Sequence, residues 1–111
     1  MASLLLKLTF WILCGVVVVL SLLPVDQLPP VTLDVWDKAQ HALGFALLTT
    51  AGWLAYPRQR ARLASGLLLL GAGIEFAQSF TGWRQGDAWD WLADAVGIAI
   101  VMLVAQQRPP A

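Results

Sequence analysis

The chain has 111 residues, of which 59% are hydrophobic and 13% are charged, and its mean hydropathy is +0.69. A soluble domain averages about 45–50% apolar and about 25% charged residues, so this composition indicates a membrane protein without a separate soluble domain. The formal net charge is zero, which gives no support to nucleic-acid binding. The single cysteine, Cys14, excludes a disulfide framework within the chain.

Four apolar stretches, 4–23, 39–56, 63–80 and 88–106, follow one another along the chain. As helices they would each reach about 27–30 Å, enough to cross the hydrocarbon core of a bilayer. Proline, which breaks helices, stands only outside them. Its positions are Pro24, Pro29, Pro30, Pro57, Pro109 and Pro110. The sequence therefore predicts one domain over 1–111, an all-α membrane protein with four transmembrane helices in an antiparallel bundle.

The first stretch, LLLKLTFWILCGVVVVLSLLP, also has the early positive charge and apolar core of a signal peptide. No small-x-small cleavage site follows it, so we expect a retained helix. Lys7 would then extend its ammonium group to the membrane interface.

The charges are divided between the two sides of the predicted bundle. The cytoplasmic loops of membrane proteins are enriched in Lys and Arg, which places both termini and the loop between the second and third helices in the cytoplasm. The basic residues on that side are Lys7, Arg58, Arg60, Arg62 and Arg108. All seven acidic residues then fall on the outer half: Asp26, Asp34, Asp37, Glu75, Asp87, Asp90 and Asp94.

The second stretch opens with DKAQHALGF, which contains the chain's single histidine. Asp37 and His41 are four residues apart and therefore lie on one face of a helix. Two interpretations of Asp37 stay open: its side chain caps the helix, or it orients the imidazole of His41. Histidine is the residue type whose unperturbed pKa lies near neutral pH, and His41 is the single histidine of the chain.

The third and fourth stretches carry acids inside apolar helices. Glu75 and Gln78 are three residues apart, and Asp90 and Asp94 are four apart, so each pair shares a helix face. A carboxylate at the centre of a spanning helix costs about 2.5–3.5 kcal/mol, less near the interface. We therefore expect these groups to face inward, where they hydrogen-bond with His41, Gln78 and Arg84 or line a wetted cavity. An alternative for Glu75 and Gln78 is that they stabilise the contact between helices through polar bonds. We expect Asp87 to be a solvated loop residue or the cap of the fourth helix.

Together these positions predict an outward-facing polar pocket between the second, third and fourth helices. Its predicted residues are Asp37, Lys38, His41, Glu75, Gln78, Arg84, Asp90 and Asp94. Small residues predict close helix packing around it, with Ala93 and Gly97 on the fourth helix and Gly73 and Ala77 on the third.

The order of these rare polar residues resembles the VanZ-like family of small bacterial integral membrane proteins. The family marks are Asp-Lys-x-x-His-x-x-x-aromatic, Glu-x-x-Gln, an Arg, an Asp six residues later, and an Asn followed by a Gly on the last helix. The matching positions here are Asp37, Lys38, His41, Phe45, Glu75, Gln78, Arg84, Asp90 and Gly97. The chain departs from the pattern at Asp94, where the family more often has Asn. The resemblance implies a multi-pass protein of the bacterial cytoplasmic (inner) membrane and a link to low-level teicoplanin resistance.

Three functions are compatible with the pattern. The first is a pocket that binds a cell-envelope lipid or precursor, or that modulates susceptibility to the glycopeptide teicoplanin. The second is a membrane-embedded enzyme acting on an envelope lipid by acid/base or metal-dependent chemistry, with His41, Glu75, Asp90 and Asp94 as the candidate residues. No cofactor is predicted outright, but these ligand types would suit Mg²⁺ or Mn²⁺. The third is ion transport, which the scarcity of polar groups on the inner half disfavours. Membrane lipids are expected partners, and a homo-oligomer is compatible with the pattern.

Overall fold

The structure, a computed structural model, describes residues 2–24, 34–82 and 86–107. All regular structure in these ranges is helical, which confirms the all-α prediction. The helices are α1 (Ala2–Leu22), α2 (Asp34–Ala55), α3 (Arg60–Gln78) and α4 (Ala88–Gln106). Each corresponds to one of the four apolar stretches.

The largest difference from the predicted boundaries is the start of α2, at Asp34 rather than at 39. The prediction that Asp37 is the N-cap is therefore wrong, because Asp37 lies within the first turn. No proline lies between Pro30 and residue 39 to delay the start of the helix, and acidic residues in a first turn are stabilised by the positive end of the helix dipole. The side chains of residues 34–37 lie outside the described part of the structure.

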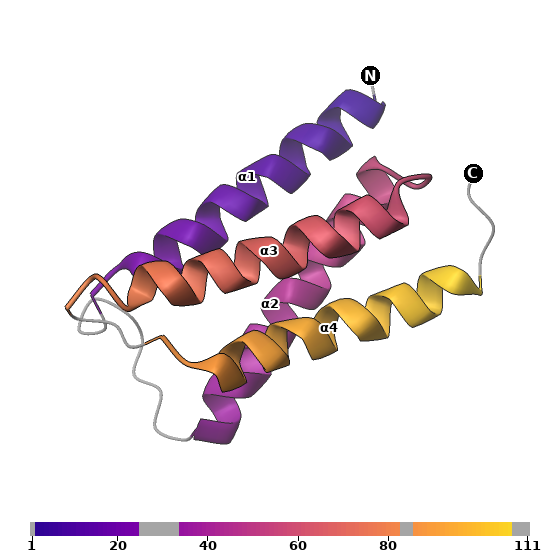
Figure 1. Cartoon of the computed structure of the whole chain (residues 1–111). Coiled ribbons are helices and arrows are strands. Elements are labelled where there is room, and N and C mark those ends of the chain that lie inside the picture. Colours follow the sequence, from indigo (N-terminus) through magenta and orange to yellow (C-terminus); the bar gives the residue numbers. More distant parts are fainter. Residues whose placement is uncertain (1, 25–33, 83–85, 108–111) are drawn as a thin grey trace.

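Successive helices alternate in direction. Figure 1 shows the N-terminal end of α1, the connection between α2 and α3 and the C-terminal end of α4 at one end of the molecule. Contacts within this end agree, since the Lys7 ammonium lies 5.3 Å from the ring centre of Tyr56 and the Arg60 guanidinium donates to the Ala105 carbonyl. The ends of α1 and α3 and the starts of α2 and α4 lie at the opposite end.

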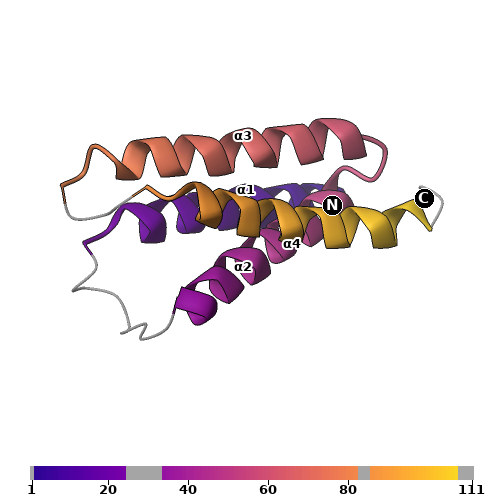
Figure 2. The ribbon, with the colours of Figure 1, turned by 60° about the horizontal axis from the view of Figure 1, so that its bottom comes forward.

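The core lies where α2 crosses the other helices at a steep angle (Figure 2). α2 packs against α1, α3 and α4, and it is closest to α4. Phe10, Phe45, Leu48, Leu67 and Ile98 are among the buried side chains that bring α1–α4 together. Burial of such apolar side chains supplies most of the packing energy of a small bundle.

Glycine decides how closely α2 and α4 approach. A Cβ atom on Gly97 would lie 2.1 Å from the carbonyl oxygen of Ala42, well inside van der Waals contact. The prediction of close packing at Gly97 is confirmed. The corresponding prediction for Gly73 is wrong, because it is exposed and a Cβ there would meet nothing within 4 Å.

Two of the described helices are long and apolar enough to cross a membrane, over Ser3–Leu22 and Ala88–Gln106. Neither is a buried core helix, since only 11% of the apolar window of the first and 28% of that of the second is buried. Large apolar side chains instead point outward, among them Trp11, Ile12 and Leu103.

A hydrogen bond from the Trp91 indole to the Leu68 carbonyl, at 2.9 Å, joins α4 to α3. We expect Trp91→Phe to lower the free energy of unfolding by about 1 kcal/mol, the net contribution of one such bond. Thermal unfolding in a mild detergent measures this. Trp89→Phe is the matched control, because Trp89 is 69% exposed. Equal losses of unfolding free energy in the two variants would contradict a stabilising role for the Trp91–Leu68 hydrogen bond.

Candidate functional site

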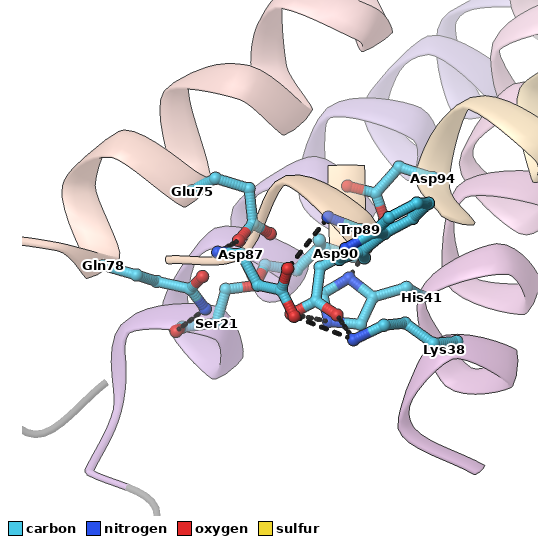
Figure 3. A network of polar contacts seen from close by, with 10 residues as sticks. Ser21, Lys38, His41, Glu75, Gln78, Asp87, Trp89, Asp90 and Asp94 are labelled. Atoms are coloured by element: carbon cyan, nitrogen blue, oxygen red, sulfur yellow. Dashed lines mark hydrogen bonds and ion pairs between the residues drawn. The ribbon is translucent and has the colours of Figure 1, made fainter. Parts of the chain in front are cut away.

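Polar side chains from three helices meet at the acidic end of the molecule (Figure 3). α2 contributes Lys38 and His41, α3 contributes Glu75, and the start of α4 contributes the others. We call the following residues the polar cluster: Lys38, His41, Glu75, Asp87, Asp90 and Asp94. The structure thus brings together five of the eight residues predicted for the pocket, and adds Asp87.

The remaining three residues predicted for the pocket are Asp37, Gln78 and Arg84, and none of them is part of the polar cluster of the described residues. The side chain of Asp37 and all of Arg84 fall outside the described residues. The prediction that Gln78 hydrogen-bonds to the acids is wrong in the described structure, because its amide Nε2 donates to the Ser21 carbonyl oxygen of α1 at 2.8 Å. Sequence reasoning missed this role of α1; its only signal was that Ser21 is a polar residue near the end of an apolar helix.

His41 and Asp94 form the deepest pair of the polar cluster. The Nδ1 atom of His41 lies 3.0 Å from Oδ1 of Asp94, which is only 1% exposed. Asp94 fits between the helices because α3 has a glycine opposite it: a Cβ on Gly71 would lie 3.0 Å from Oδ2 of Asp94. An ionised carboxylate only accepts hydrogen bonds, so Nδ1 of His41 is the donor in this contact when Asp94 is ionised.

Asp90 connects the histidine to Lys38. Its Oδ2 atom lies 3.5 Å from Nε2 of His41, and its Oδ1 atom pairs with the Lys38 ammonium group. Lys38 also pairs with Oδ2 of Asp87 at 3.0 Å. Lys38, in the first turns of α2, is thus an ion-pair partner of the acids that was not among the partners expected from the sequence, and Arg84, which was, lies outside the described residues.

Asp87 is the N-cap of α4, which confirms one of its two predicted roles. Its Oδ1 atom accepts a hydrogen bond from the Trp89 backbone N–H at 2.9 Å, and its other oxygen pairs with Lys38. The bond from Trp89, followed by the Lys38 ammonium, lowers the pKa of the Asp87 carboxyl below its ordinary value. Asp87 therefore holds the start of α4 and the start of α2 together in its ionised form.

Glu75 approaches the polar cluster from α3 and is 8% exposed. Its Oε2 atom accepts a hydrogen bond from the Asp87 backbone N–H at 2.8 Å. The segment before α4 comes this close because residue 86 is glycine: a Cβ there would lie 2.3 Å from the Glu75 carbonyl oxygen. The Oε1 atom of Glu75 is buried and has no hydrogen-bond partner among the described residues.

Gln78 has the same property one turn later on α3. It is 3% exposed, and its Oε1 atom is also buried without a hydrogen-bond partner in the described structure. A buried acceptor that stays unpaired costs about 1–3 kcal/mol. The two oxygens lie on one face of α3, beside the polar cluster. They could accept hydrogen bonds from a ligand or bind a cationic group.

Three members of the polar cluster lie near enough to one another to be candidate ligands of a metal ion. His41, Glu75 and Asp90 each offer one ligand atom, and these atoms lie within 4.8 Å of one another. They come from three different helices, α2, α3 and α4.

A separate groove lies at the other end of the molecule, between α1 and α3. It has a volume of about 570 Å³ and is lined mainly by apolar side chains, including Phe10, Cys14 and Leu67, with Arg62 at its edge. This groove shares no residue with the polar cluster and is not the pocket predicted from the sequence.

Comparison of the chain with protein-family models, with curated proteins and with solved structures finds no match to any of them. The chemistry of the polar cluster and the exposed apolar helices are therefore the grounds on which a function is assigned.

Proposed function

We propose that the chain spans the bacterial cytoplasmic membrane four times, with both termini in the cytoplasm and the polar cluster toward the outer side. The outward-facing apolar side chains of α1 and α4 support burial in lipid rather than in water. The separation of charge supports the orientation, because Lys7 contacts Tyr56 and Arg60 contacts Ala105 at the end of the bundle where α2 and α4 finish, whereas the polar cluster lies near the starts of α2 and α4.

Cysteine labelling tests this topology. In a Cys14→Ser background, we expect Ala88→Cys to react with a membrane-impermeant maleimide on spheroplasts. Gln59→Cys should react only after the membrane is permeabilised, because Gln59 lies in the short connection before α3 at the basic end. The reverse labelling pattern, or recovery of the protein without detergent, would contradict the proposal.

We further propose that the outer site binds the polar headgroup of a cell-envelope lipid or lipid-linked precursor. The observation that carries this proposal is a pair of buried acceptors, Oε1 of Glu75 and Oε1 of Gln78, that have no hydrogen-bond partner within residues 2–24, 34–82 and 86–107. Hydroxyl or ammonium groups of a headgroup would supply the missing donors. The resemblance to the VanZ-like pattern supports an envelope ligand, and binding of such a precursor is a route by which the protein would modulate teicoplanin susceptibility.

A titration of the purified protein in detergent tests headgroup binding. Short-chain phosphatidylethanolamine, short-chain phosphatidylglycerol and teicoplanin are added separately, and tryptophan fluorescence reports the bound fraction. We expect at least one of them to bind, and Gln78→Leu to weaken that binding about tenfold, as the loss of one buried hydrogen bond would.

Gln40→Leu is the matched control for this titration, because Gln40 lies on α2 near the site but is exposed. We expect it to bind as the wild type does. Equal affinity in the wild type and Gln78→Leu would remove Gln78 from the site, and failure of all three probes to bind would contradict headgroup binding.

A further inference from the structure

We infer that His41, Glu75 and Asp90 bind one divalent transition-metal ion between α2, α3 and α4. This inference deepens the proposed function and rests on it for the role of the ion. Open coordination positions on a bound ion would accept oxygen atoms of a phosphate-bearing headgroup.

The separations of the ligand atoms support the inference. Metal–ligand bonds of about 2.0–2.2 Å place tetrahedral ligands roughly 3.3–3.6 Å apart. Nε2 of His41 and Oδ2 of Asp90 already lie 3.5 Å apart, and all three ligand atoms lie within 4.8 Å of one another. Small side-chain adjustments would close the set around an ion, without movement of the helices.

The orientation of His41 supports it independently. Its Nδ1 atom lies 3.0 Å from the buried Oδ1 of Asp94, and its Nε2 atom lies 3.5 Å from Oδ2 of Asp90. A metal ion at Nε2 would therefore take the place of a proton there, while Nδ1 keeps its hydrogen bond to Asp94. Metal-binding histidines almost always donate their second ring N–H to a carboxylate, a carbonyl or a water. Asp94 is therefore a positioning residue for the imidazole and not a ligand.

The electrostatics of the polar cluster favour a further cation. Among the described residues, four carboxylates face the Lys38 ammonium and His41, and Lys38 pairs with Asp87 and with Oδ1 of Asp90. This leaves Oδ2 of Asp90 and the unpartnered Oε1 of Glu75 without an ammonium partner among the described residues. Glu75 is more than nine-tenths buried, so a cation at this position would remove a large desolvation cost.

The ligand types indicate which ions to test. One imidazole and two carboxylates form a mixed nitrogen and oxygen set, which suits Mn²⁺ or Zn²⁺ better than the all-oxygen preference of Mg²⁺. Three protein ligands leave at least one position open, as in catalytic metal centres and unlike closed structural zinc sites.

Isothermal titration of the full chain in detergent, after treatment with a chelator, tests the inference with Mn²⁺, Zn²⁺ and Mg²⁺. We expect one Mn²⁺ or Zn²⁺ ion per chain, weaker binding of Mg²⁺, and a Tm that rises as the bound ion saturates. Glu75→Gln should weaken binding at least tenfold, roughly the effect of losing one charged ligand. Its Oε1 atom can still accept the Asp87 N–H, so the fold is retained.

Asp87→Asn is the matched control. It removes the same charge within the polar cluster, its amide oxygen can still cap α4, and Asp87 is not one of the three ligands. We expect its metal affinity to stay within about threefold of the wild type, since Asp87 makes no bond to the ion and the attraction from its partly exposed charge is screened by salt. If Glu75→Gln and Asp87→Asn weaken metal binding equally, the ion is held only by diffuse electrostatic attraction, and the proposed metal site is wrong.

Absence of binding by the wild type at about 1 mM Mn²⁺ and Zn²⁺, the weak end of specific binding, would also overturn the inference. The headgroup titration on metal-free protein separates the two proposals. Headgroup binding without metal binding leaves the proposed function intact and removes the metal site. Metal binding without binding of any headgroup probe keeps the site and removes the proposed ligand.

Discussion

Replacing Gly97 by alanine is expected to lower the free energy of unfolding by about 1–3 kcal/mol, the usual cost of overpacking a tight contact. The added Cβ would lie 2.1 Å from the Ala42 carbonyl oxygen and 3.1 Å from the Ala46 backbone nitrogen. These are backbone atoms of α2, so no side-chain rotation relieves the clash and the two helices must separate. Thermal unfolding in detergent and the yield of membrane-inserted protein measure the effect.

Gly44→Ala is the control for this prediction, since Gly44 lies on α2 and a Cβ there would meet nothing within 4 Å. Alanine is favoured over glycine in a helix interior by roughly 0.5–1 kcal/mol, so this variant should be as stable as the wild type or slightly more stable. A Gly97→Ala variant with unchanged stability would show that α2 and α4 do not approach this closely.

Asp94→Ala is expected to destabilise the protein by about 3 kcal/mol, in the range measured when one partner of a buried polar pair is removed. Asp94 is only 1% exposed, and its loss would leave the buried side of His41 without its hydrogen-bond acceptor. The cavity left by the carboxylate adds to this cost. Chemical or thermal unfolding of the purified variant gives the magnitude.

Asp94→Asn separates the hydrogen bond from the charge. An asparagine Oδ1 atom can still accept the proton from Nδ1 of His41, and the side chain fills nearly the same volume. We expect a change of less than about 1 kcal/mol in the free energy of unfolding. If Asn destabilises as much as Ala, the charge of Asp94 is essential; if neither destabilises, the His41 contact contributes little to stability.

The sequence alone was sufficient for the helices and for part of the site. Apolar stretches bounded by prolines such as Pro57 fall on the helices, because a helix in an apolar environment must satisfy its own backbone and cannot continue through proline. The four-residue spacing of Asp90 and Asp94 places both carboxylates on one face of α4, where His41 contacts them. The helix bounds and the shared face of Asp90 and Asp94 depend on neighbouring residues in the sequence, because helical periodicity is a local property of the chain.

The pairing of individual side chains was decided only by the tertiary structure. Gln78 donates to Ser21, Glu75 accepts from the Asp87 backbone, and Lys38 pairs with Asp87 and Asp90. These contacts depend on how far each helix is rotated and shifted against its neighbours, and the residues that set this are glycines. Gly97 is in close contact with the backbone of α2, whereas Gly73 has no neighbour within 4 Å of a Cβ position. Each of the two glycines has an alanine one helical turn away, so this spacing alone does not distinguish them. Sequence spacing specifies the face that a residue shares, whereas the packing of α2 across α3 and α4 determines which atoms meet.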